Sequence, residues 1–255
     1  RNSGRASRYY NGCYNSTPNT TTVSSCKNKS NCTCTSGVCT QTTGYSHTWV
    51  KNDHSTWTGC VMDRDQDNDV GIATPSGTST NFYAENTTTC VNATTTSIRL
   101  APVTPLTDIR DTTGAQTLSD AVDAMQANGN TNQTIGIIHG LQTLVPGNPY
   151  NAGTLPKDTT MVLIILSDGL NTQNRWTSNA DSINAREKLA CQAAKDKGAI
   201  IYAVFVDLNG TQGNSAPLQD CATDAQHYFD LTSADQIDTA FKAIGTQITQ
   251  LRVAQ

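Results

Sequence analysis

Asp168, which follows the apolar run Met161–Leu166 and Ser167, is the residue of this chain best placed to do chemistry. The run is typical of a buried parallel strand that ends in a loop carboxylate. In open α/β sheets ligands bind outside the carboxyl ends of the strands, so this loop puts an oxygen donor at the usual binding position. The sequence has no nucleophile elbow, no phosphate-binding loop and no zinc-protease helix. It therefore favours a metal-dependent binding module over an enzyme.

A second set of carboxylates alternates along residues 63–69, as the ligands of a calcium loop do. The set consists of Asp63, Asp65, Asp67 and Asp69. A calcium loop has Gly at its sixth position and a bidentate Glu at its twelfth, whereas this run has Asn68 and Thr74 there. We interpret the run as a solvated acidic turn, with a Ca²⁺ site as the alternative.

Nine cysteines indicate an oxidising compartment. Five lie within the first 40 residues, and their spacing lacks the paired C-x-x-C of a zinc site, so disulfides are favoured there. Cys191 lies late in an expected helix and Cys221 lies before the last expected strand. We expect a disulfide between these two, with a pair of buried free thiols as the alternative. The odd total leaves one cysteine free or bonded outside the chain.

Composition narrows the class of partner and the location. A net charge of -4 and a pI near 5.4 argue against nucleic acid or an anionic membrane as the main partner. The longest strongly apolar run, Met161–Leu166, has six residues, too few to span a bilayer. The chain begins without Met or an apolar leader, so we expect a processed fragment of a longer protein. Apolar and charged contents of 36% and 15% are typical of a polar extracellular or cell-surface protein, with the periplasm as an alternative location.

Two regions are expected, at residues 1–95 and 96–255. The first has few apolar repeats and seven of the nine cysteines, which predicts a loop-rich, disulfide-stapled region. In the second, strands expected at 97–101, 161–166, 199–206 and 227–231 alternate with helices expected at about 117–129, 135–145, 181–197 and from Ser233 to about 251. This alternation predicts an α/β fold with a mostly parallel sheet flanked by helices.

The alternation, together with Asn128–Gly136 and Leu166–Gly169, resembles a von Willebrand factor A domain. More narrowly, the chain is similar to the C-terminal part of TadG-like proteins of bacterial Tad (tight-adherence) pilus systems, in the segments Trp57–Gln66, Gly129–Gln133, Ser167–Trp176 and Leu251–Gln255. The resemblance covers residues 57–255 in patches. It implies a non-enzymatic binding or assembly protein of the bacterial surface, acting in pilus biogenesis or adhesion. The alternatives are a structural subunit of a surface filament or envelope complex, and a metal-dependent hydrolase that uses Asp168 and residues 63–69.

The resemblance also implies a metal site. Such domains often hold Mg²⁺ with an Asp-x-Ser-x-Ser loop, a Thr that Thr131 matches and an Asp that Asp168 matches. From the residues alone, Thr131 could equally be a helix N-cap and Asp168 an Asx-type turn. No Asp-x-Ser-x-Ser occurs in the 255 residues, and in the family that loop lies upstream of this region. Two oxygen ligands hold Mg²⁺ poorly, so we expect Mg²⁺ in the intact protein and no bound metal on this chain alone.

The same resemblance implies that the first central strands are missing from this chain. The first of them would lie beside residues 161–166, and without it an apolar strand would present an unpaired edge. We therefore expect another segment to cover that strand. The upstream half of the same protein, a neighbouring subunit and a piece of residues 1–95 are the alternatives, and the resemblance favours the upstream half.

Overall fold

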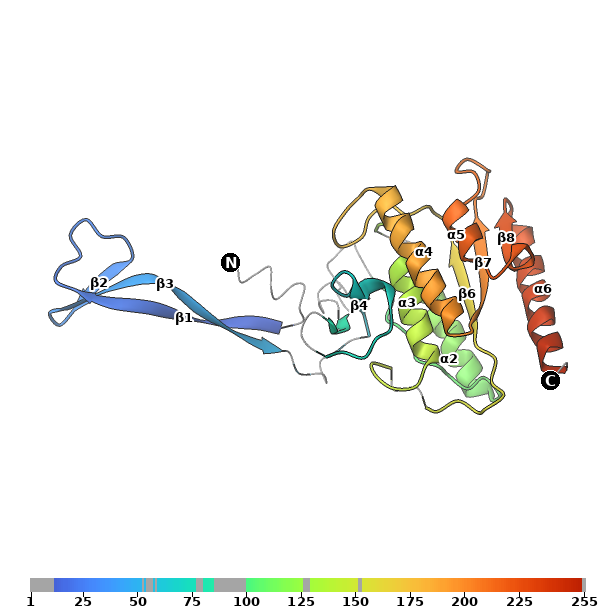
Figure 1. The fold of residues 1–255 in the computed structure, drawn as a ribbon, viewed down its shortest axis with the longest axis horizontal. Coiled ribbons are helices and arrows are strands. Elements are labelled where there is room, and N and C mark those ends of the chain that lie inside the picture. The colour runs from blue at the N-terminus through green and yellow to red at the C-terminus, as the bar shows by residue number, and fades with distance from the viewer. Residues whose placement is uncertain are drawn as a thin grey trace.

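The computed structural model describes residues 12–51, 53, 57, 59–76, 80–84, 100–125, 129–150 and 153–253. Figure 1 shows a long β-ribbon at one end of the molecule and an α/β body at the other. Most of the strand expected at 97–101 lies outside the described residues, as does Cys90. None of the described helices combines the length and the apolar composition needed to cross a bilayer.

The body is built on a parallel sheet of three strands. These are β6 (Val162–Ser167), β7 (Ile200–Val206) and β8 (Tyr228–Leu231), in the order β6-β7-β8. Central strand β7 is covered on both faces: Ile201, Val204 and Phe205 are fully buried. A strand without a solvent-facing side is typical of parallel sheets packed between helices, so its sequence is apolar throughout instead of alternating. The α/β fold class is confirmed.

Helices pack on both faces of this sheet (Figure 1). Helices α3 (Gln133–Leu144) and α4 (Ala180–Asp196) share one apolar cluster with β6 and β7. Helix α6 (Ala234–Val253) packs in a second cluster with β7 and β8, and the short α5 (Ala216–Cys221) packs in a third with β7. Helix α4 ends before Gly198, whose φ of +80° is a left-handed conformation that a side chain would disfavour. Burial of the two sheet faces therefore holds the body together.

Helix α2 (Thr112–Asp123) begins earlier than the expected Thr117, because Asp111 caps it by accepting a hydrogen bond from the Gly114 N–H. Leu118 and Ala121 on this helix are half-buried, but Val122 is 62% exposed and Met125, two residues beyond the helix, is 58% exposed. The described part of the chain thus leaves the C-terminal end of this stripe, at Val122 and Met125, open. The described residues therefore cover only part of the amphipathic stripe that the sequence predicts.

Strand β6 is an edge strand within the described ranges, so the segment expected to cover it is not among the described residues. Only β7 pairs with it there, and Ile164 and Leu166 are 39% and 56% exposed. The strand carries no charge, proline or bulge of the kind that protects natural sheet edges. The β6 edge and the apolar stripe of α2 are therefore two unpartnered apolar surfaces of the same body.

The N-terminal region contains the expected loops and cysteines and, in addition, a ribbon that the sequence did not predict. Strand β1 (Gly12–Val23) runs antiparallel to β3 (Val38–Lys51), and β2 (Cys32–Thr35) pairs with the start of β3. Most residues of these strands are polar, so the alternation of apolar and polar residues that reveals a strand in a sequence is missing. Backbone pairing and the β-branched Thr residues favour the strands instead. Three small elements follow the ribbon in the chain: β4 (Val61–Met62), the 3-10 helix η2 (Asn68–Val70) and β5 (Tyr83–Ala84). A second 3-10 helix, η4 (Ala225–His227), lies directly before β8 in the body.

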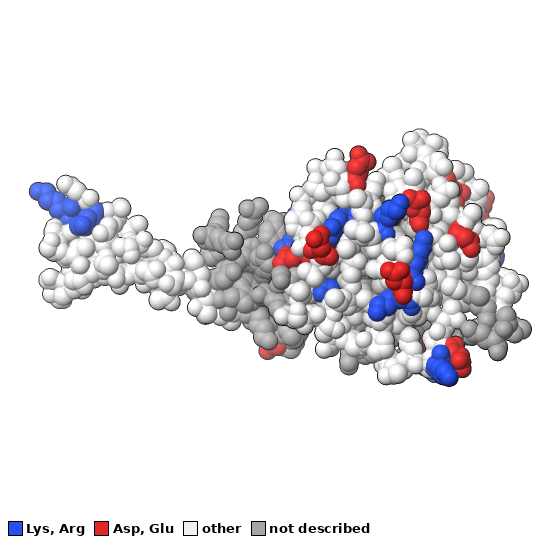
Figure 2. Space-filling model, in the orientation of Figure 1, with Lys and Arg blue, Asp and Glu red and all other residues white. Residues whose placement is uncertain are grey.

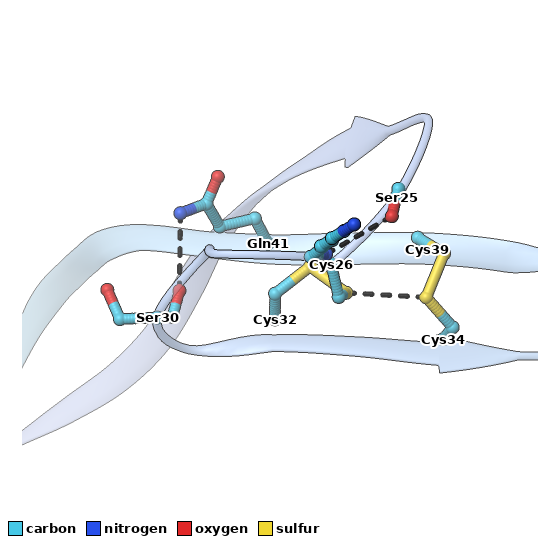
Figure 3. The surroundings of a disulfide bond; sticks show 8 residues. Ser25, Cys26, Ser30, Cys32, Cys34, Cys39 and Gln41 are labelled. Carbon is cyan, nitrogen blue, oxygen red and sulfur yellow. Dashed lines mark hydrogen bonds between the residues drawn. A yellow bond between two sulfur atoms is a disulfide. The ribbon is translucent and has the colours of Figure 1, made fainter.

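Two disulfides staple the far end of the ribbon, Cys26–Cys32 and Cys34–Cys39 (Figure 3). The Cys26 and Cys34 sulfur atoms lie 3.3 Å apart, so the two bridges pack against each other. Beside them the Gln41 side-chain amide donates to the Ser30 carbonyl. An isolated ribbon buries little apolar surface and is marginally stable in water, so these covalent links hold its tip in one conformation.

In the body, a disulfide joins Cys191 of α4 to Cys221 of α5, and both residues are buried. It encloses a segment with a sequence separation of 30. We expect the double variant Cys191→Ala/Cys221→Ala to lose about 2–4 kcal/mol of unfolding free energy, because the unfolded chain gains conformational freedom. Urea denaturation followed by circular dichroism measures this loss. As a control, Cys34→Ala/Cys39→Ala opens a bridge with a sequence separation of 5 at the ribbon tip and should leave the unfolding of the body unchanged. Equal midpoints for Cys191→Ala/Cys221→Ala and the wild type would refute the expectation.

Candidate metal centre at the carboxyl end of the sheet

The structure brings Thr131 and Asp168 to the same end of the sheet. Asp168 directly follows β6, and Thr131 lies two residues before α3. A Cβ atom on Gly169 would lie 3.3 Å from the Thr131 hydroxyl oxygen, so glycine at 169 allows the two segments to approach closely. The Asp168 side chain is exposed, and no donor in the described ranges engages its carboxylate. Two oxygen donors thus come from loops that meet where ligands of such sheets bind.

Backbone hydrogen bonds fix the distance between these two loops. The Thr131 carbonyl accepts from the N–H groups of Thr172 and Gln173 at 3.0 and 3.3 Å. In return the Thr131 N–H donates to the Thr172 hydroxyl at 2.8 Å. Because Thr131 is held by its backbone, its side chain is left without a structural role in these bonds. The N-cap residue of α3 is Asn132, so the interpretation of Thr131 as the N-cap is wrong.

The turn at Asp168 is made by its neighbour. The Ser167 hydroxyl donates to the Gly169 carbonyl at 2.8 Å and accepts from the Gly169 N–H at 3.3 Å. The Gln133 side-chain amide donates to the Ser167 hydroxyl oxygen and to the Gly169 carbonyl oxygen. These bonds close the loop without the Asp168 carboxylate, which differs from the Asx-type turn considered from the sequence. The carboxylate is therefore available to a ligand.

Asn171 ties the loop to the core below it. Its carbonyl oxygen accepts from the Gln133 N–H at the start of α3 at 2.9 Å. Its amide nitrogen donates to Asn184 at 2.9 Å and to Glu187 at 2.6 Å, both on α4. A single buried side chain thus joins the loop to two helices. This residue escaped the sequence analysis because an asparagine in a loop carries no signal of burial.

Glu187 is a buried carboxyl group beneath this loop. Burial raises the pKa of Glu187 to about 7, and the hydrogen bond from Asn171 offsets part of that rise. Its second carboxyl oxygen has no hydrogen-bond partner in the described structure. One sequence signal could have identified it, since it stands on the same helix face as the buried Ile183, Ala190 and Ala194.

The acidic run at 63–69 is bound by two arginines instead of lying in solvent. Asp63 accepts from the Asn132 amide and from the backbone N–H of Arg175, at 3.0 and 3.2 Å. Asp65 pairs with the Arg175 guanidinium at 2.9 Å. Burial raises the pKa of Asp63, while these hydrogen bonds lower it. The interpretation as a solvated acidic turn is therefore wrong for Asp63, which is buried.

The second arginine of the network is Arg186, which stands on α4. It pairs with the exposed Asp67 at 2.8 Å and with the buried Asp69 through two of its nitrogens. Asp69 and Arg186 are 117 positions apart, so nothing in the local spacing could reveal the pairing. The network clamps residues 63–69 onto the loop that carries Asp168 and onto α4.

The donors at the sheet end supply only part of an Mg²⁺ shell, since this ion takes six oxygen ligands in an octahedron. Beside Thr131 and Asp168, Asp207 at the end of β7 has one carboxylate oxygen occupied by the N–H groups of Gln212 and Gly213. The described residues therefore do not fit Mg²⁺ by themselves. Two other groups of side chains converge in the described ranges, Cys26 with Cys34 and Cys39, and Glu187 with Cys191 and Cys221. Their cysteines are held in disulfides, so neither group is a metal site in this state.

Comparison with known families agrees with this geometry. The model of the von Willebrand factor type A domain matches residues 76–243, which are 168 of the 255 residues. The chain therefore belongs to the von Willebrand factor A family, whose domains generally serve adhesion and protein interaction and often bind a metal ion. The match begins within the region 1–95. No curated protein and no solved structure matches the chain.

Proposed function

We propose that this chain is a non-enzymatic binding or assembly module of the bacterial cell surface, and that its partner is another protein. The observation that carries the proposal is the exposed Asp168 carboxylate on a loop whose next residue, Gly169, lies close to the Thr131 hydroxyl. Both stand on loops fixed by hydrogen bonds, at the end of the sheet where ligands bind. A fixed, incomplete set of oxygen donors suits a bridging metal ion that a partner helps to coordinate.

The relation to Tad-type pilus biogenesis is part of the same proposal. Two segments that carry the likeness to TadG-like proteins, 57–66 and 167–176, contact each other through Asp63 and Arg175. An extracellular, cell-surface or periplasmic location is supported by three disulfides and by Cys60, which is also disulfide-bonded.

We propose further that the upstream half of the same protein lies against the β6 edge and the apolar stripe of α2. Leu166 on β6 and Met125 beyond α2 are both more than half exposed. Each fully buried side chain of this type contributes about 1.5–3 kcal/mol, so an added strand and its loops would stabilise the body substantially. A strand that runs parallel to β6 would also end near Asp168, where oxygen ligands are needed.

The second candidate function is a structural subunit of a surface filament or envelope complex. The ribbon favours it, because a stapled arm that extends away from the body is suited to contact between subunits (Figure 1). The hydrolase alternative gains nothing from the acidic run, since Arg175 and Arg186 engage its carboxylates.

The metal is tested by calorimetry on this chain with and without the upstream segment added as a separate polypeptide. We expect no specific Mg²⁺ or Mn²⁺ binding to the chain alone, and binding that requires Asp168 once the segment is present. Asp158→Ala, which changes an exposed aspartate in a loop before β6, is the matched control for Asp168→Ala. A micromolar site on the chain alone that Asp168→Ala abolishes would contradict the proposal, because other residues would then complete the shell.

A further inference from the structure

The far end of the body, away from the ribbon, carries an apolar groove between β8 and α6. It has a volume of about 340 Å³ and is lined by Phe229, Leu231, Asp235, Gln236, Thr239, Ala240 and Ala243. Strand β8 is the outer strand of the sheet on this side, so the groove lies at a sheet edge. Asp235, one of the lining residues, is exposed and forms no ion pair with another described residue, whereas Asp230 alternates with Phe229 and Leu231 along β8 and lies on the opposite face of the strand. The groove therefore offers an apolar floor with one acidic residue at its margin.

The tip of the ribbon has the complementary features. Between β1 and β3 it carries Lys27 and Lys29, and at the start of β3 it exposes 56% of Val38. The two disulfides fix this tip, so little conformational freedom is lost when it binds. Figure 2 shows lysines at the tip and no acidic side chain on the face of the ribbon in view.

The charges of the two parts are opposite. Residues 12–51 contain three lysines and no Asp or Glu, whereas residues 52–255 contain 11 Lys and Arg and 21 Asp and Glu, a net charge of 11 − 21 = −10. The ribbon and the β8–α6 groove lie at opposite ends of the molecule (Figure 1), so a tip can reach the groove of another copy but not its own. Because the two surfaces differ, each contact leaves a free tip at one end and a free groove at the other.

We propose that the ribbon tip of one copy docks into the β8–α6 groove of a second copy, so that the chain associates head to tail. Val38 enters the apolar groove, and Lys27 and Lys29 face Asp235 at its margin. The contact is independent of Asp168 and of any metal ion. Since its charged pairs are at the rim, the association weakens as ionic strength rises.

Two variants that cannot polymerise test this contact. Val38→Asp destroys the tip and keeps the groove, and Asp235→Lys/Thr239→Lys destroys the groove and keeps the tip. All three positions are exposed, and unchanged thermal unfolding establishes that both variants fold. We expect wild type to form species larger than a dimer in sedimentation velocity, each variant alone to remain a 27.2 kDa monomer, and their equimolar mixture to form a species of twice that mass.

Lys157→Glu, an exposed charge change in the loop before β6, is the control and should associate like wild type. A mixture that sediments as monomers overturns the proposal, as does a wild type that is monomeric at low ionic strength. Association that survives Val38→Asp but is lost in Leu166→Lys also overturns it, because the copies would then meet at the β6 edge. None of these outcomes depends on the metal experiment, so the two proposals succeed or fail separately.

Discussion

Replacing Arg186 with Met is expected to lower the free energy of unfolding by about 3–5 kcal/mol. The side chain of Asp69 is only 1% exposed, and Arg186 is its ion-pair partner. Methionine keeps the apolar stem of the arginine and removes its charge. The Asp69 carboxylate would then remain buried without its counter-ion, and the desolvation of an unpaired charge is costly. Chemical denaturation at neutral pH measures the loss.

The same arginine provides its own control. Asp67→Asn removes the other carboxylate that Arg186 contacts, but this side chain is 88% exposed, so the expected loss is about 0–1 kcal/mol. The double variant Arg186→Met/Asp69→Leu should recover most of the stability, because it removes both buried charges together. If Arg186→Met and Asp67→Asn had equal effects, burial of Asp69 would not be what makes this pair important.

Glu187 is expected to make the protein less stable as the pH rises from 4.5 to 7. Burial raises its pKa in the folded protein to about 7, from 4.5 as the reference value. Within this window the folded protein retains a proton that the unfolded chain has released, so raising the pH favours unfolding. The full difference corresponds to about 3 kcal/mol, and this group contributes no further change above pH 7. Denaturant midpoints recorded across this range measure the slope.

Glu187→Gln separates this effect from that of His139. Burial lowers the pKa of His139 to about 4, so the folded protein binds its proton less readily than the unfolded chain. That histidine makes stability fall as the pH falls from 6.5 towards 4, which is the opposite slope. The difference between wild type and Glu187→Gln therefore isolates Glu187, and glutamine can still accept the hydrogen bond from Asn171. The same pH slope in both proteins would show that Glu187 does not titrate in this window.

The sequence by itself determined the elements that position the candidate site. Strands β6, β7 and β8 and helices α3, α4 and α6 follow the expected segments within a few residues. Apolar runs and helical stripes are local patterns, and burial in a parallel sheet requires them at those positions. The place of Asp168 followed from the same rule, since a carboxylate directly after a buried parallel strand must emerge at the carboxyl end of the sheet.

Only the tertiary structure decided which partners these residues have. Asp69 meets Arg186 across 117 positions, and Asn171 joins the start of α3 to Glu187 on α4. The polar ribbon and the exposed edge of β6 were likewise not decided by local patterns. The physical reason is the same in each case. Residue spacing specifies which face of an element is apolar, whereas ion pairing, burial of a charge and coverage of a sheet edge depend on which distant segment the chain path brings against it.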